Sequence, residues 1–168
     1  MGEQSVCAPV AVIAVGNPSR GDDALGPALL ARFADWLATE GRCADFELIE
    51  DFQLQIEHAL DLRGRELVLF IDAGERTPAP FMFTPVSPSA LVAHTSHALA
   101  PAAVLQVYLQ TEQLAPPPAF LLAVCAESFE LGETLSESAR NFADAAFGFL
   151  TLLCQHPLPD AWRAATRC

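Results

Sequence analysis

Two adjacent carboxylates, Asp22 and Asp23, lie in a short loop and have the chemistry to bind a cation or to move a proton. The loop lies between an unbroken apolar run at residues 10–15 and a helical apolar period at residues 25–37. A strand–loop–helix junction of this kind is where open α/β sheets bind their ligands. We expect one carboxylate to cap the following helix, and Asp23 to be the one that is free for chemistry.

The glycines of this junction do not have the spacing of a phosphate-binding loop. Gly16, Gly21 and Gly26 recur at every fifth residue, whereas a dinucleotide fingerprint needs G-x-G-x-x-G and a P-loop ends in Gly-Lys-Ser/Thr. The two carboxylates would also repel an anion at the helix N-terminus. The junction therefore favours a cation over a phosphate.

A third carboxylate and two histidines occur where an α/β fold could bring them to the same edge of its sheet. Asp72 ends a second apolar run, and His94 and His97 precede a helical pattern that begins at Pro101. Because parallel strands present their carboxyl ends on one edge, Asp23, Asp72 and a histidine could converge there. Two oxygens and one nitrogen suit a borderline divalent cation, while the carboxylates alone suit acid–base catalysis. Asp72 as a turn cap and His97 as a surface residue are the simpler alternatives.

Strand and helix patterns alternate along the chain. This alternation predicts a three-layer α/β/α fold with a mostly parallel, roughly five-stranded sheet and helices on both faces. We expect residues 1–168 to form a single domain, in which residues 156–168 are a loosely held tail that could dock through Trp162. The patterns predict strands at 9–15, 46–50, 66–71, 81–83 and 120–125, and helices at 24–40, 53–62, 101–113 and 136–153.

The composition excludes some partners. With 21 acidic against 9 basic residues the formal net charge is −12, which disfavours nucleic acid and anionic membranes. No apolar run is long enough to cross a bilayer. The five cysteines are scattered without a Cys-x-x-Cys pair, which predicts reduced thiols. With no export signal in the first residues, we expect a cytoplasmic protein, and a monomer.

Four segments, taken in order, resemble the nickel-iron hydrogenase maturation endopeptidases. They are GNPSRGDDALG at residues 16–26, LFIDA at 69–73, TSH at 95–97 and SFELGE at 128–133. The resemblance extends over residues 10–150. The first motif is most similar to members that serve cytoplasmic NAD-reducing hydrogenases.

The resemblance implies an aspartyl-type endopeptidase that removes the C-terminal extension of a hydrogenase large-subunit precursor after nickel insertion. It implies that Asp23, Asp72 and His97 contact nickel, which the substrate carries and the enzyme does not hold permanently. Since no serine or cysteine has the setting of a nucleophile, we expect water to attack the peptide, with Asp23 or Asp72 as general base. Many members have Glu at the position of Asp23, and His94 is a second imidazole close to His97.

Three other functions fit parts of the pattern. A nickel-binding metallochaperone without peptidase activity would carry the same site. A nucleotide-binding domain of flavodoxin-like shape would have the same alternation of elements, although the acidic junction disfavours it. An unrelated aspartic-type peptidase on a similar sheet would also use two carboxylates.

Overall fold

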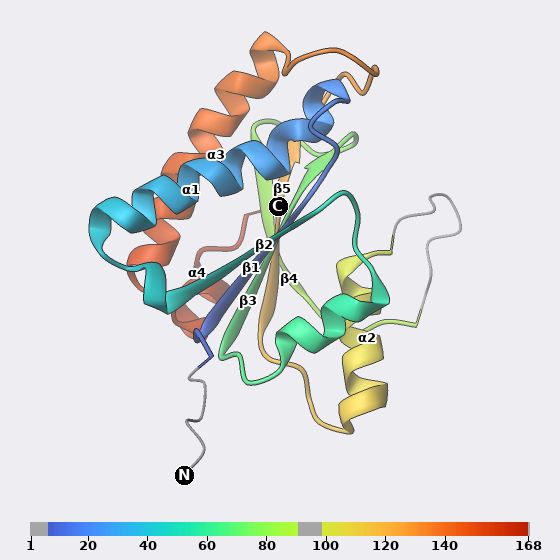
Figure 1. Ribbon diagram of the computed structural model, residues 1–168, viewed down its shortest axis with the longest axis vertical. Coiled ribbons are helices and arrows are strands. Elements are labelled where there is room, and N and C mark those ends of the chain that lie inside the picture. The colour runs from blue at the N-terminus through green and yellow to red at the C-terminus, as the bar shows by residue number, and fades with distance from the viewer. Residues whose placement is uncertain (1–6, 91–98, 168) are drawn as a thin grey trace.

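The computed structural model describes residues 7–90 and 99–167, and its centre is a five-stranded sheet (Figure 1). The strand order is β2-β1-β3-β5-β4. The first four strands of this order run parallel, and β4 pairs with β5 in the antiparallel direction. The strands are β1 (Val10–Val15), β2 (Phe46–Asp51), β3 (Leu67–Gly74), β4 (Phe81–Val86) and β5 (Ala119–Cys125).

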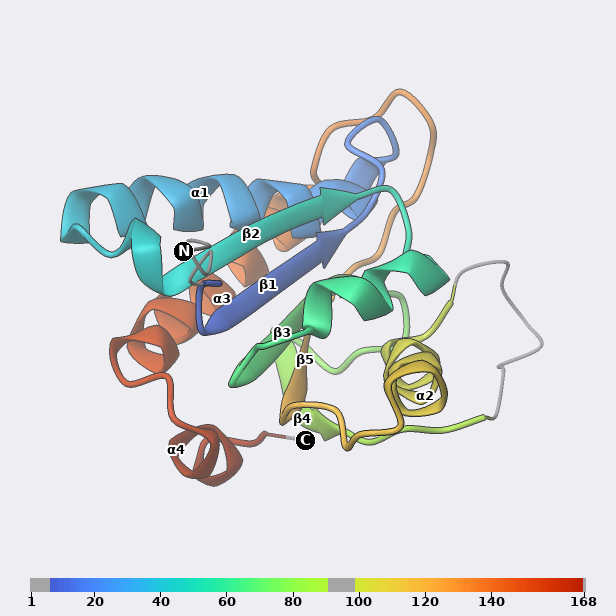
Figure 2. The same ribbon diagram turned by 60° about the horizontal axis from the view of Figure 1, so that its bottom comes forward.

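Helices cover both faces of the sheet, as predicted. Figure 2 shows α1 and α3 on one face, and α2 with the 3₁₀ helix η3 on the other. The helices are α1 (Leu25–Glu40), α2 (Pro101–Glu112), α3 (Glu137–Gln155) and α4 (Pro159–Ala164), and the 3₁₀ helices are η1 (Gly21–Ala24), η2 (Cys43–Asp45) and η3 (Ile56–Leu62). The helix predicted at residues 53–62 is therefore shorter than expected and of the 3₁₀ type.

The apolar run of β1 explains why this strand lies inside the sheet. All six of its residues are buried, and their side chains alternate between the two faces. Val10, Val12 and Ala14 belong to the core under α1 and α3, whereas Ala11 and Ile13 belong to the core under η3 and α2. A strand buried on both faces in this way is typical of a three-layer α/β/α fold.

The point where the chain changes direction in the sheet lies between β1 and β3. From β1 the chain passes outward to β2, and after β3 it builds the other half of the sheet. In open α/β sheets this switch point leaves a crevice beyond the carboxyl ends of the two strands. Any ligand site of this fold is expected there.

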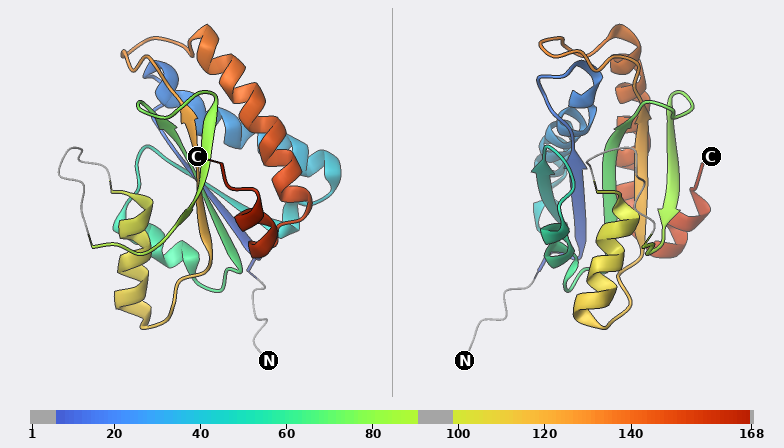
Figure 3. Two further views of the ribbon diagram at one scale, coloured as in Figure 1. Left: turned by 180° about the vertical axis from the view of Figure 1, so that it is seen from behind. Right: turned by 90° about the vertical axis from the view of Figure 1, so that its right-hand side faces the viewer.

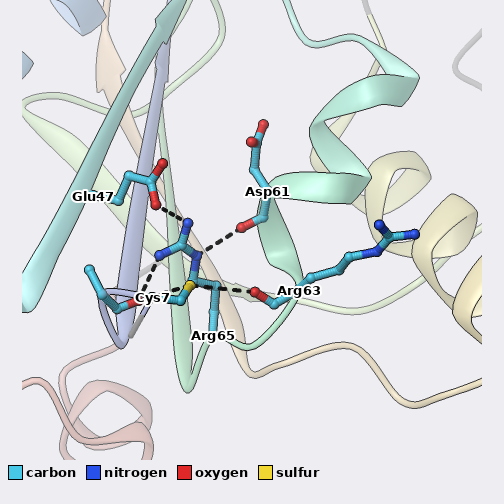
Figure 4. A network of polar contacts seen from close by, with 6 residues as sticks. Cys7, Glu47, Asp61, Arg63 and Arg65 are labelled. Carbon is cyan, nitrogen blue, oxygen red and sulfur yellow. Dashed lines mark hydrogen bonds and ion pairs between the residues drawn. The ribbon is translucent and has the colours of Figure 1, made fainter. Parts of the chain in front are cut away.

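The opposite end of the sheet is closed by a network of polar contacts around Arg65 (Figure 4). The Arg65 guanidinium donates to the backbone oxygens of Ala8, at 2.7 Å, and Asp61, at 2.9 Å, and it forms an ion pair with Glu47. The Cys7 thiol approaches the Arg63 carbonyl oxygen. These contacts hold the start of β1 beside the turn that leads into β3.

The C-terminal segment packs against the domain within residues 156–167, which corrects the prediction that residues 156–168 are a loosely held tail. The Trp162 side chain is 0% exposed, and its indole N–H donates to the Leu153 carbonyl oxygen at 3.0 Å. Its ring meets Phe83 and Phe120 edge-on. Figure 3 shows the segment returning from α4 to β4, where Arg167 forms an antiparallel bridge with Phe83. The two prolines of the segment do not prevent docking, because Pro159 starts α4.

Within residues 7–90 and 99–167, no helix combines the length and the apolar character needed to span a membrane. The four cysteines that the structure describes form no disulfide with one another.

Replacing Trp162 with Ala is expected to lower the free energy of unfolding by about 3 to 5 kcal/mol, because it empties a buried site and removes the hydrogen bond to Leu153. The control is Leu158→Ala, since this side chain is 62% exposed and should change stability by less than about 0.5 kcal/mol. Urea denaturation measures both. Equal effects of the two substitutions would show that the tail is loosely held after all.

Candidate active site

A cavity of about 340 Å³ opens at the switch point between β1 and β3. Four segments line it: the loop after β1, the loop after β2, the end of β3, and Leu99 ahead of α2. All lie at the carboxyl ends of the parallel strands or beside them, where the topology predicts a ligand site. The polar side chains on its wall are Asn17, Arg20, Asp23, Gln53 and Asp72.

Asp72 reaches the cavity from within β3. The sequence predicted that this strand ends before Asp72, but pairing with β5 continues it to Gly74. Pairing with β1 stops earlier, at Ile71. Asp72 is therefore the first residue of β3 that has no partner on the β1 side, and this is the side on which the cavity lies.

The environment of Asp72 favours its protonated form. Burial raises the pKa of this carboxyl to about 7; the backbone N–H of Ala73 opposes the rise, and the negative charge of Asp23 adds to it. The Ala73 N–H donates to Oδ1 at 2.8 Å. Among the described residues Oδ2 has no hydrogen-bond partner, so this oxygen is available to a ligand.

Asp23 faces the same cavity from the loop after β1. Its Oδ2 accepts a hydrogen bond from the Asn17 backbone N–H at 2.9 Å, and Oδ1 has no hydrogen-bond partner among the residues that the structure describes. Asp23 and Asp72 thus share the cavity, and each offers one oxygen that the described protein does not use.

Asp22 has a structural role. Its side chain is 0% exposed, and its two oxygens accept hydrogen bonds from the backbone N–H groups of Glu127, Ser128 and Ser136 and from the Ser136 hydroxyl. Burial alone would raise the pKa of Asp22, but these four hydrogen bonds together outweigh it and lower the pKa below its usual value. The expectation that one of the two carboxylates caps the following helix is wrong, since neither caps α1; Asp22 instead binds a segment more than a hundred residues away.

The cavity loop is also fixed by its backbone. Gly21 N–H donates to the Glu133 carbonyl oxygen, and the Gly132 N–H donates to Ser19. A side chain at Gly16 would lie 2.0 Å from the Asp23 carbonyl oxygen, so only glycine allows this turn. Gly26 lies in the first turn of α1, where a Cβ would be 2.3 Å from the Val15 carbonyl oxygen of β1.

The structure brings together only part of the predicted metal site. Asp23 and Asp72 line one cavity, whereas His97 and the second candidate His94 lie outside the described residues. Within the described part of the chain, no three His, Cys, Asp or Glu side chains form a group that could hold a metal ion. The catalytic and metal-binding roles of Asp23, Asp72 and His97 stay predictions.

Sequence reasoning missed the wall that follows β2 and the guanidinium of Arg20. Phe52, Gln53 and Leu54 line the cavity because β2 ends at the same edge as β1 and β3. The rule that parallel strands share one edge could have placed these residues there. None of the described residues that line the cavity is Ser, Thr or Cys, so a side-chain nucleophile has no support in this part of the chain.

Several solved structures with the same architecture are hydrogenase maturation proteases. One is the nickel-iron hydrogenase maturation protease HycI from Thermococcus kodakarensis KOD1, which superposes with a TM-score of 0.68 at 20% sequence identity. The superposition covers 90% of this chain and 96% of the HycI chain. For the hydrogenase maturating endopeptidase HybD from E. coli the TM-score is 0.62 at 20% identity, over 87% of this chain and 92% of that one. The hydrogenase 2 maturation peptidase from Thaumarchaeota archaeon SCGC_AB-539-E09 gives 0.58 at 22% identity, over 86% and 97%.

The chain has the hydrogenase maturation protease fold. No protein-family model matches the sequence, and no curated protein matches it either. The likeness thus rests on the arrangement of the elements, and it extends over nearly the whole hydrogenase maturation protease fold. In this chain the cavity lies between β1 and β3, within the part of the fold that the superpositions cover.

Replacing Asp22 with Asn should lower the free energy of unfolding at pH 7 by about 2 to 4 kcal/mol, since one acceptor oxygen becomes a donor that faces backbone N–H groups. Because the pKa of Asp22 is lowered, its contribution to stability is present above the unfolded value of 3.8 and is lost as the pH falls through the folded value. The difference between the two proteins should therefore shrink below pH 3.8. Urea denaturation measures this difference. The control is Asp23→Asn, which should change the free energy of unfolding by less than about 1 kcal/mol.

Asp72→Asn should stabilise the metal-free protein relative to the wild type as the pH rises. The folded pKa of about 7 lies above the unfolded 3.8, so the contribution of Asp72 is complete below pH 3.8 and is lost as the pH rises through 7. As the pH rises from 5 to 8.5, the free energy of unfolding of the variant should increase by roughly 2 to 3 kcal/mol relative to that of the wild type. Denaturation in the presence of a chelator tests this, and a difference that does not change with pH would contradict it.

Proposed function

We propose that this protein is an endopeptidase that removes the C-terminal extension of a nickel-iron hydrogenase large-subunit precursor after nickel insertion. The observation that carries the proposal is the pair of carboxylates, Asp23 and Asp72, that share one cavity at the switch point of a hydrogenase maturation protease fold. Water is the attacking group in this proposal, and the two carboxylates on the cavity wall can accept its proton. The resemblance of the first motif makes the precursor of a cytoplasmic NAD-reducing hydrogenase the first substrate to try.

Nickel in this proposal arrives with the substrate and serves its recognition. Asp23 Oδ1 and Asp72 Oδ2 are oxygens without protein partners among the described residues, and carboxylate oxygens with an imidazole nitrogen suit a borderline divalent ion. We propose His97 as that imidazole. In support, Leu99, two residues farther along the chain, lines the same cavity.

The two carboxylates can divide the proton transfers of peptide hydrolysis. Asp23 or Asp72, when ionised, accepts a proton from the water molecule that attacks the scissile carbonyl. The protonated carboxyl then donates this proton to the nitrogen of the leaving amine. A pKa of about 7 suits Asp72 to both steps near neutral pH, because both of its forms are populated there. The negative charge of Asp23 nearby helps to hold the proton on Asp72 in the free protein.

A nickel-binding metallochaperone without peptidase activity is the second candidate. The same two open oxygens would bind nickel without any chemistry on a peptide, and the described cavity wall holds no nucleophile that would mark it as hydrolytic. The two functions differ in one outcome, which is cleavage of the precursor.

Nickel-loaded precursor should lose its C-terminal peptide when mixed with the wild-type protein, and nickel-free precursor should not. We expect Asp23→Asn and Asp72→Asn to lower the rate at least about 100-fold, because each removes a group that contacts the reacting centre. His97→Ala tests the third predicted residue. The matched control is Asp35→Asn on the exposed face of α1, which should cleave at the normal rate.

Mass spectrometry of the precursor reports the removed peptide. Nickel binding by the wild type without cleavage of any nickel-loaded precursor would favour the metallochaperone. Cleavage at the normal rate by Asp72→Asn would remove Asp72 from the reaction.

A further inference from the structure

We propose that Arg20 is the specificity-determining residue of the cavity and binds a carboxylate of the substrate segment that enters it. This inference rests on the proposed peptidase function. It concerns a residue that the carboxylate chemistry of the site does not use.

The guanidinium of Arg20 has no partner among the described residues. All nine basic residues of the chain are arginines, and all of them are described. Seven of the nine have a partner for their guanidinium group: five form ion pairs, Arg140 donates to a backbone carbonyl oxygen, and Arg167 lies over an aromatic ring. The remaining two are Arg20 and Arg76. Of all nine, Arg20 alone lines the cavity. An unpaired cation is notable in a chain with a net charge of −12, where carboxylates are abundant.

The backbone that carries Arg20 is held in place from several sides. Its N–H donates to the Asn17 oxygen at 3.1 Å, and its own carbonyl oxygen accepts from the Asp23 N–H at 3.1 Å. The neighbouring residues Ser19 and Gly21 hydrogen-bond to the loop at residues 132–133. The Arg20 side chain is exposed, while its backbone is held in place. A bound ligand therefore has to order only the side chain, which lowers the entropic cost of binding.

The charges of the cavity explain why a cation at this position would select substrates. Asp23, together with Asp72 when it is ionised, would repel an acidic peptide, as would the acidic surface of the protein. A guanidinium offers two parallel N–H donors that match a carboxylate, so Arg20 can offset this repulsion and add a directed contact.

The position of Arg20 also distinguishes binding from chemistry. Arg20 is exposed, whereas Asp72 lies partly buried within β3. A group at the rim contacts the substrate away from the scissile bond, so its loss should raise KM and leave kcat largely unchanged. The ligand is either an acidic side chain of the precursor's extension or its terminal carboxylate.

The experiment compares kcat/KM of the wild type, Arg20→Gln and Arg20→Lys on nickel-loaded precursor. We expect Arg20→Gln to lower kcat/KM roughly 10- to 100-fold, mainly by raising KM. Arg20→Lys should lower kcat/KM less, because lysine keeps the positive charge but lacks the two parallel N–H donors of the guanidinium. Arg163→Gln on α4 removes the same charge from an exposed site outside the cavity and should leave kcat/KM unchanged. The melting temperatures of the Arg20 variants should equal that of the wild type.

Two altered precursors identify the carboxylate that is bound. In one, the Asp and Glu residues of the extension become Asn and Gln; in the other, a Gly-Ser segment is added to move the terminal carboxylate away. The penalty of Arg20→Gln should disappear with the precursor that lacks the relevant group, as in a double-mutant cycle. A penalty that persists with both altered precursors, a loss confined to kcat, or no penalty at all would each overturn the inference. Failure of the wild type to cleave the precursor would instead overturn the proposed function.

Discussion

The cavity depends on one buried carboxylate. Asp22 lies in the first loop of the chain and accepts four hydrogen bonds from the segment between β5 and α3. A buried charge is stable only when its oxygens are well satisfied, so this segment must stay in register with the first loop. Ser136 both donates to Asp22 and caps α3 through Ala139, and the start of α3 is thereby fixed to the cavity loop. Asp22 thus fixes the loop that carries Asp23, although its own side chain does not line the cavity.

The adjacent aspartates Asp22 and Asp23 have different roles because the 3₁₀ turn of η1 directs their side chains to different partners. Asp22 turns inward, where four donors saturate its oxygens and its pKa is lowered. Asp23 turns toward the cavity, where one donor from Asn17 leaves an oxygen open. The same side chain can therefore hold a fold together or remain available to a ligand, depending on how many donors surround it.

Local patterns in the sequence were sufficient for the layers of the fold and for the meeting of Asp23 and Asp72. The apolar runs of β1 and β3 specify buried parallel strands, and such strands place their following residues on one edge. The partners of Asp22 could not be predicted, since they lie over a hundred residues away and no local rule selects them. The helical period at residues 53–62 does not separate a 3₁₀ helix from an α-helix. The sequence singled out Trp162 as a residue that could dock, but its aromatic partners on β4 and β5 are distant in the chain and no local pattern selects them.

The bridge between the C-terminal segment and β4 has a consequence for how the protein behaves at high concentration. β4 is the edge of the sheet, and an exposed edge presents unpaired backbone groups that can recruit a strand from another molecule. Here Phe83 exchanges two backbone hydrogen bonds with Arg167, and Pro85 offers no N–H farther along the strand. The end of the chain thus acts as a cover against edge-to-edge aggregation, and its removal would expose a template for self-association at the edge of the sheet opposite β2.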